Sequence, residues 1–135
     1  MIVANCVSKR FGDILAVNNI SLEIKTGSVF GLIGTNGAGK STFLRLLSGI
    51  LQADSGALAI DDARVFENIS TKERCFYISD DQYFFSNSTP NEMRNYYAGI
   101  YPKFDPNRFD RLLNSFGLEG RRKINTFSKG MRKQV

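Results

Sequence analysis

One segment, Gly34–Thr42 with the sequence GTNGAGKST, limits what this chain can fold into more than any other. It fits the pattern G-x-x-x-x-G-K-[ST], in which glycines let the backbone turn sharply and direct its N–H groups toward phosphate oxygens. The preceding Val29–Ile33 is apolar and predicts a buried strand. The apolar residues that follow recur with the spacing of one helix face. They are Phe43, Leu46, Leu47 and Ile50. The sequence therefore predicts a phosphate-binding loop between a strand and a helix.

The residue types in this loop suit a triphosphate. Lys40 is expected to reach the β- and γ-phosphates as a point charge, and Ser41 to place its hydroxyl on Mg²⁺. Thr42 is expected to add a hydroxyl near the α-phosphate, and the start of the helix to add free N–H groups and a positive dipole end. The other expected binding residues are Gly34, Asn36, Gly37, Ala38 and Gly39.

Composition limits the remaining possibilities. The chain has 135 residues and 42% hydrophobic content, enough for a buried core, and no apolar run approaches the ~18 residues of a membrane span. Its first residues do not have the pattern of a signal peptide, and two cysteines are too few for a disulfide scaffold, which favours a reduced, cytosolic protein. The net charge is +5, but the basic residues are scattered, so no nucleic-acid partner is expected.

Short strands and two helices are predicted in the rest of the chain. Strand composition covers Ile2–Ser8, Asn19–Ile24, Ala57–Ile60 and Cys75–Ser79, and one helical turn is expected over Ser70–Arg74. Thr89–Glu92 has the pattern of a capping box with proline at the first helical position, a second helix starts at Asp105-Pro106, and Gly117 is expected to end it. The apolar stripes of these helices are expected to lie in the core. They are Met93, Tyr96, Tyr97, Ile100 and Tyr101 in the first, and Phe109, Leu112, Leu113 and Phe116 in the second.

The segments Ser8–Gly12, Ala16–Leu22 and Gly27–Gly34 resemble the opening of an ATP-binding cassette (ABC) ATPase. The resemblance implies an α/β fold of the P-loop NTPase type, with a mixed sheet, the P-loop helix and a small helical subdomain. The implied division is a nucleotide-binding core over residues 1–86, the helical subdomain over 87–126 and a signature segment over 127–135. Phe11 matches the aromatic residue that stacks on adenine in this family.

A departure from the family lies after the strand expected at Cys75–Ser79. The family usually has a glutamine there, which contacts Mg²⁺ and couples the site to the helical subdomain. Asp80 occupies that position by spacing, and Gln82 follows two residues later. A carboxylate oxygen can also bind Mg²⁺, directly or through water, so Asp80 is favoured slightly over Gln82 as the metal and catalytic candidate beside Lys40. Both can instead be solvated turn residues.

The segment Phe127–Met131, with the sequence FSKGM, is similar to the family signature Leu-Ser-Gly-Gly-Gln at Ser128 and Gly130. In the family this segment closes over ATP bound to the P-loop of a second cassette. The resemblance therefore implies that Ser128 and Gly130 contact nucleotide in a head-to-tail cassette dimer.

The resemblance implies the ATP-hydrolysing subunit of a membrane transporter, which binds ATP and Mg²⁺, works with transmembrane permease subunits, and lies in the cytoplasm on the inner face of the membrane. Residues 77–132 are most similar to bacterial exporter-type cassettes. The alternative is a cassette ATPase of translation or DNA repair, but those usually have two cassettes or long insertions. A full cassette continues with a strand that ends in Asp and Glu, and then a His. This chain is therefore expected to be the truncated front part, binding nucleotide without turnover.

Overall fold

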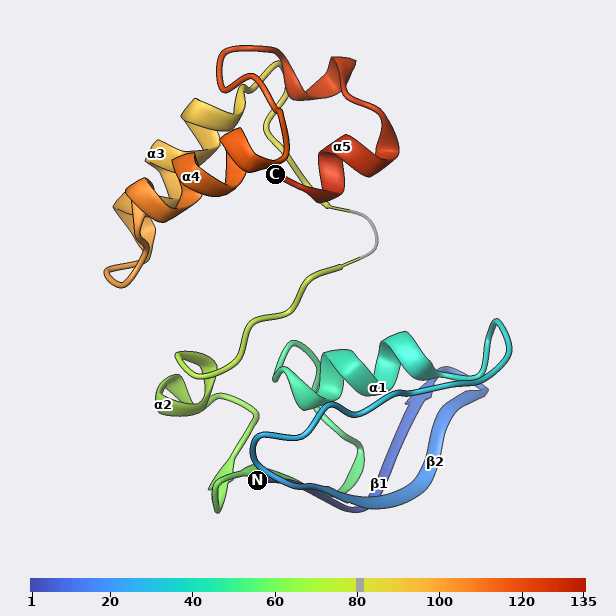
Figure 1. Ribbon diagram of the computed structural model, residues 1–135. Helices are drawn as coiled ribbons and strands as arrows, with labels where there is room; N and C mark the ends of the chain where they lie inside the picture. The colour runs from blue at the N-terminus through green and yellow to red at the C-terminus, as the bar shows by residue number, and fades with distance from the viewer. Residues whose placement is uncertain (80–81) are drawn as a thin grey trace. The chain divides into compact units, whose positions relative to one another are not determined.

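The computed structural model describes residues 1–79 and 82–135, and the chain forms two compact units, Met1–Tyr77 and Ile78–Val135 (Figure 1). Each unit has secondary structure and buried side chains of its own, so each is described by itself. Within the described residues, every helix is too short or too polar to cross a lipid bilayer.

The first unit is built on a four-stranded antiparallel sheet with strand order β2-β1-β3-β4. Its strands are β1 (Ile2–Phe11), β2 (Ile14–Ile24), β3 (Ser55–Ile60) and β4 (Ala63–Arg64). The hairpin of β1 and β2 pairs Ile2 with Ile24 at one end and Phe11 with Ile14 at the other. The strands predicted at 2–8, 19–24 and 57–60 are confirmed, and the first two extend toward each other as far as the turn at 12–13.

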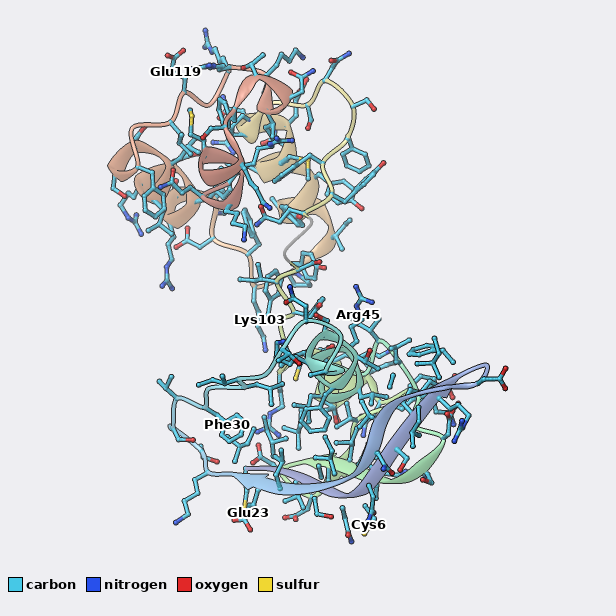
Figure 2. All side chains as sticks on the ribbon, turned by 90° about the vertical axis from the view of Figure 1, so that its right-hand side faces the viewer. Cys6, Glu23, Phe30, Arg45, Lys103 and Glu119 are labelled. Carbon is cyan, nitrogen blue, oxygen red and sulfur yellow. The ribbon has the colours of Figure 1, made fainter. Side chains whose placement is uncertain are left out.

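Helix α1 (Lys40–Leu47) covers one face of this sheet (Figure 1). Phe43 and Leu46 are only 2% and 1% exposed and pack with Val7 of β1 and Val17 of β2. Cys6 and Glu23 project from the opposite face, away from α1 (Figure 2). The α/β class and the buried positions of Phe43, Leu46 and Leu47 are confirmed. The expectation that Ile50 shares this face is wrong, because the helix ends at Leu47 and leaves Ile50 53% exposed.

Two predicted strands do not form. The segment Val29–Ile33 has no regular secondary structure, and Val29 and Ile33 are almost fully exposed, although Leu32 packs against the core around α1. Cys75–Ser79 is likewise irregular. A strand that is buried on both faces of a parallel sheet needs neighbouring strands for its backbone groups. The described residues supply no such neighbour, and the observed sheet is antiparallel throughout.

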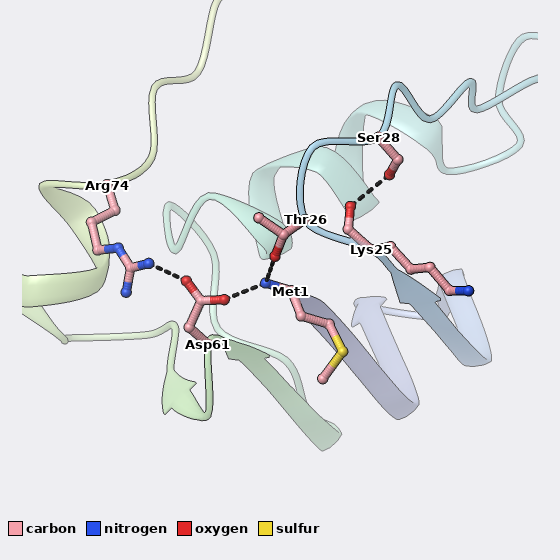
Figure 3. A network of polar contacts seen from close by, with 6 residues as sticks. All are labelled: Met1, Lys25, Thr26, Ser28, Asp61 and Arg74. Carbon is pink, nitrogen blue, oxygen red and sulfur yellow. Dashed lines mark hydrogen bonds and ion pairs between the residues drawn. The ribbon is translucent and has the colours of Figure 1, made fainter.

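A polar network holds the turn that leads from β2 toward the glycine-rich loop (Figure 3). The amino group of Met1 donates to Oγ1 of Thr26 at 2.6 Å and also pairs with Asp61, which pairs with Arg74 as well. The amino group of Met1 is the main reason that the pKa of Asp61 lies below its ordinary value. Ser28 closes the turn by donating its hydroxyl to the carbonyl oxygen of Lys25 at 2.6 Å. The first unit also contains α2 (Ile69–Lys72), which confirms the predicted helical turn.

The second unit is helical. It contains α3 (Pro90–Ile100), α4 (Pro106–Ser115), the 3₁₀ turn η1 (Ile124–Thr126) and α5 (Lys129–Lys133). Both predicted helix starts are confirmed: Thr89 and Glu92 form the capping box of α3, and Asp105 caps α4 by accepting from the N–H of Arg108. Gly117 follows the end of α4 with a φ of 68°.

The core of the second unit is smaller than the apolar stripes of α3 and α4 predict. Its buried residues are Met93, Leu113, Leu118, Ile124 and Phe127. Tyr97 and Phe109 are partly buried against them. The remaining stripe residues are about half exposed, so their predicted core positions are wrong. They are Tyr96, Ile100, Tyr101, Leu112 and Phe116. Helices α3 and α4 have only eleven and ten residues and bury one side of their apolar stripes in this core. Among the described residues, no other element packs against the outer side of each stripe.

Candidate functional site

The loop predicted from the GTNGAGKST pattern lies in the first unit, between the extended segment Val29–Ile33 and the start of α1. Its backbone turns at residues 36–39, where the N–H of Ala38 donates to the carbonyl oxygen of Thr35 at 3.3 Å. Gly39 is the N-cap of α1, and no side chain caps this helix end. The first N–H groups of α1 are therefore available to an anion, as the sequence predicts.

Gly39 also fixes the position of the loop on the sheet. Its φ is 81°, and a Cβ atom there would lie 2.0 Å from the carbonyl oxygen of Ala16 and 3.6 Å from Cγ2 of Val17. Only glycine allows the start of α1 to approach β2 so closely. The loop is thus in direct contact with the part of β2 that pairs with the end of β1.

Lys40 is the first residue of α1, and its side chain turns back over the loop. Its ammonium nitrogen donates to the carbonyl oxygens of Gly34 and Thr35 at 2.7 and 2.6 Å. These bonds hold the ammonium above the ring of backbone groups that would surround a phosphate chain. The geometry suits the role predicted for Lys40, because the charge is already at the loop and free to exchange carbonyl for phosphate oxygens.

Ser41 and Thr42 follow in the first turn of α1, with Ser41 exposed and Thr42 half-buried. Mg²⁺ in nucleotide sites commonly takes one or two protein oxygens together with phosphate oxygens and water. The accessible hydroxyl of Ser41 fits such a ligand. No group of three or more Cys, Asp or Glu side chains that could hold a metal occurs among residues 1–79 and 82–135.

Phe11, the residue predicted to stack on a base, ends β1 and is 45% exposed. Lys9, two residues earlier on the strand, pairs in register with Val17, and a Cβ at Gly39 would lie 3.6 Å from Cγ2 of Val17. Phe11 therefore lies at the end of the hairpin that the start of α1 approaches. Its contact with a base remains a prediction.

The candidates after residue 79 belong to the second unit. Asp80, the favoured metal candidate, lies outside the described residues, together with Asp81. Gln82 is described and half-buried. Which of Asp80 and Gln82 contacts a metal stays a prediction.

The signature segment has a defined local structure. Phe127 is buried in the helical core with the guanidinium carbon of Arg122 5.3 Å from its ring centroid. Ser128 is the N-cap of α5, and its hydroxyl accepts from the N–H of Met131 at 3.2 Å. Ser128 and Gly130 are both exposed at the start of this short helix, so both can be reached from outside the unit.

Sequence reasoning missed two residues beside the predicted site, Lys9 and Asp54. The ammonium of Lys9 donates to Oδ1 of Asp54 at 2.7 Å and lies 5.6 Å from the ring centroid of Phe11. The hydrogen bond from Lys9, and after it the one from the N–H of Arg10, hold the pKa of Asp54 below its ordinary value. Lys9 and Asp54 are 45 positions apart, so no periodic pattern in the sequence predicts their pairing. The one available signal was a lysine placed two residues before the aromatic Phe11.

Together, an α/β core and a glycine-rich loop that caps a helix with free N–H groups and a lysine define a protein of the P-loop class. Residues 17–135 match the family model described as "ABC transporter", and the chain therefore belongs to the ABC transporter family.

Three comparisons illustrate this membership. The chain is 32% identical to the ABC transporter ATP-binding protein YtrB of Bacillus subtilis (strain 168) over all of its own length and 46% of that protein. It is similar to a solved ATP-binding subunit of an ABC transporter, with a TM-score of 0.81, 24% identity, and coverage of 98% of this chain and 58% of that one. A cassette described as a dimer in a post-hydrolysis state with ADP and Pi, MJ0796, has a TM-score of 0.73 and 22% identity, with coverage of 99% and 66%. The chain spans about half the length of the curated relatives it matches.

Proposed function

We propose that this chain is the nucleotide-binding part of an ABC transporter ATPase and binds ATP at the loop Gly34–Thr42. The observation that carries the proposal is the arrangement at the start of α1, where uncapped N–H groups and the ammonium of Lys40 surround one backbone turn. Such an arrangement favours a polyphosphate, because many donors and a fixed positive charge act on one anion. Phe11 would hold the base, Lys40 the β- and γ-phosphates, and Ser41 one Mg²⁺, with Asp80 or Gln82 as a second ligand.

In the assembled protein, we propose ATP hydrolysis that powers transport through transmembrane permease subunits at the inner face of the cell membrane. Ser128 and Gly130 would contact the nucleotide of a second cassette. The relatives support this proposal through their printed descriptions as ABC transporter ATP-binding proteins, and one related cassette is described as a dimer with ADP and Pi. For this chain alone we propose binding without turnover.

The test is equilibrium binding of a fluorescent ATP analogue to the 135-residue chain, with and without Mg²⁺. ATP and ADP should displace the analogue at similar concentrations, whereas AMP should displace it far less effectively because it lacks the phosphates that Lys40 and the loop would hold. Phosphate release measured on the same samples should stay at background. Equal competition by AMP would contradict the assignment of the loop, and Mg²⁺-dependent phosphate release would contradict binding without turnover.

A further inference from the structure

Three consecutive residues near the end of β1 are bound to one aspartate that lies immediately before β3. The ammonium of Lys9 donates to Oδ1 of Asp54 and the N–H of Arg10 to Oδ2, both at 2.7 Å. The N–H of Asp54 donates to the carbonyl oxygen of Ser8 at 2.9 Å. Each oxygen of the carboxylate therefore has its own donor, and the chain is fixed immediately before Phe11.

Lys9 has a second contact besides Asp54. Its ammonium nitrogen is 5.6 Å from the ring centroid of Phe11, within the distance at which a cation is attracted to an aromatic face. The side chain of Lys9 is only 16% exposed, which is low for a lysine, so it is held in this position rather than extended into solvent. The ring of Phe11 is thus restrained by a cation, while 45% of the residue's surface stays accessible.

This group of side chains lies next to the glycine-rich loop. Lys9 pairs with Val17 across the hairpin, and the N-cap of α1 approaches β2 beside it, because a Cβ at Gly39 would lie 2.0 Å from the carbonyl oxygen of Ala16 and 3.6 Å from Cγ2 of Val17. An aromatic ring at this end of the hairpin can therefore take the base of a nucleotide whose phosphates lie on the loop.

We propose that Lys9 and Asp54 are positioning residues for a purine base: Asp54 holds the ammonium of Lys9 against one face of Phe11, and the exposed remainder of the ring stacks on the base. This inference rests on the proposed function. The ammonium adds two things to the stack. It restricts the rotation of the ring before a base arrives, and its charge polarises the π-system on which the base stacks.

A role limited to holding the strands together would have a different consequence. Loss of the contact between β1 and β3 would then disturb the hairpin, and with it the loop, so that every ligand of the loop would bind more weakly. Two probes separate these cases. ATP uses both the loop and the ring, whereas inorganic tripolyphosphate uses the loop alone.

The experiment compares calorimetric binding of ATP and tripolyphosphate to the full chain and its variants. Lys9→Met keeps the length of the side chain and removes its charge, and Lys9→Arg keeps the charge. Lys9→Met should weaken ATP about two- to five-fold and leave tripolyphosphate unchanged, and Lys9→Arg should restore ATP binding. Asp54→Asn should resemble Lys9→Met. In a Phe11→Ala background, Lys9→Met should have no further effect on ATP, because the ring through which it acts is gone.

Several results would overturn the inference. Unchanged or tighter ATP binding by Lys9→Met would show that the ammonium is unnecessary or occupies the place of the base. Equal weakening of both probes would show a structural role only. If Phe11→Ala and Lys9→Met weaken ATP independently, the two residues do not act as a unit. A wild-type chain that binds neither probe would refute the proposed function as well, whereas binding of tripolyphosphate without any effect of Phe11→Ala on ATP would refute this inference alone.

Discussion

At the scale of single residues, the site depends on two features of the loop: the ammonium of Lys40, bonded to two carbonyl oxygens, and the close approach of Gly39 to β2. The first concerns the positive charge at the loop, and the second concerns the lack of room for a side chain at residue 39. They can be tested separately, because ligand affinity reports the first and the stability of the free chain reports the second.

Lys40→Ala should weaken ATP binding about ten- to hundred-fold, since a hydrogen bond to a charged group contributes roughly 1.5–3 kcal/mol. Isothermal titration calorimetry with ATP and Mg²⁺ measures this loss directly. Lys25→Ala is the matched control, because Lys25 is an exposed lysine just after β2. Similar affinities for Lys40→Ala and the wild-type chain would show that the loop does not hold the phosphates.

Gly39→Ala should destabilise the free chain more than Gly37→Ala. Both glycines have a φ above 80°, so both substitutions introduce a strain of about 1–2 kcal/mol. A Cβ at Gly39 also meets the carbonyl oxygen of Ala16 at 2.0 Å, whereas nothing lies within 4 Å of one at Gly37. The additional loss for Gly39→Ala should be about 1–3 kcal/mol by urea denaturation without nucleotide. Equal losses would place the loop farther from β2 than the structure shows.

At the scale of elements, local signals predicted starts and ends well, while burial depended on neighbours. The capping box at Thr89–Glu92, the cap at Asp105 and the end near Gly117 are all encoded within a few residues, and all are confirmed. The strand predicted at Val29–Ile33 is wrong because its apolar run specifies burial but not the strands that must lie beside it. In the same way, the periodicity of α3 and α4 marks an apolar stripe but not how much of its width is covered.

The same limit applies to the site. The loop and its lysine were predictable because the spacing itself encodes a turn, a helix start and a charge. The ion pair between Lys9 and Asp54 was not predictable from the sequence, because it joins β1 to the residue before β3 through two side chains that belong to no common motif. Asp80 and Gln82 show a third case, in which the spacing gives two candidates and the described structure does not choose between them.

The capping box of α3 makes the stability of the helical unit depend on pH. The N–H of Thr89, and after it the Thr89 hydroxyl, donate to the carboxylate of Glu92 at 2.7 and 3.0 Å and hold its pKa below the ordinary value of 4.5. A lowered pKa in the folded state means that the stabilisation is present above 4.5 and is lost as the pH falls through the folded-state value. Glu92→Gln should therefore be less stable than the wild type at pH 7.

The difference between Glu92→Gln and the wild type should shrink as the pH falls from about 4.5 through the lowered folded-state pKa, because the Glu92 carboxylate is protonated below that value and is then uncharged like glutamine. Thermal denaturation followed by circular dichroism across this range measures it. Glu119→Gln, in the exposed loop after α4, serves as the control. A constant difference at all pH values would show that the carboxylate charge does not stabilise the cap.

At the scale of the whole molecule, the division into two units predicts which residues a bound nucleotide protects from hydrogen exchange. Hydrogen exchange measured by mass spectrometry should show slower exchange with ATP in Met1–Tyr77, above all around 34–47, because binding to the native state suppresses its opening. At low protein concentration, exchange in the helical part of the second unit, from α3 onward, should stay unchanged. Added protection at 127–133 that grows with protein concentration would indicate a second chain closing over the nucleotide. Uniform protection of both units at every concentration would contradict a site formed by the first unit with only Asp80 or Gln82 added from the second.

The two hydrogen bonds of Lys40 also determine how the loop meets its ligand. A free lysine has four rotatable bonds, and immobilising such a side chain costs up to about 1.5–2 kcal/mol of conformational entropy. In this chain the carbonyl oxygens of Gly34 and Thr35 accept hydrogen bonds from the ammonium of Lys40 and hold that side chain over the loop. An arriving phosphate therefore replaces two oxygen partners with others and does not have to order the lysine. Phosphate binding should therefore require little rearrangement of Lys40, so the loop is preorganised for its ligand.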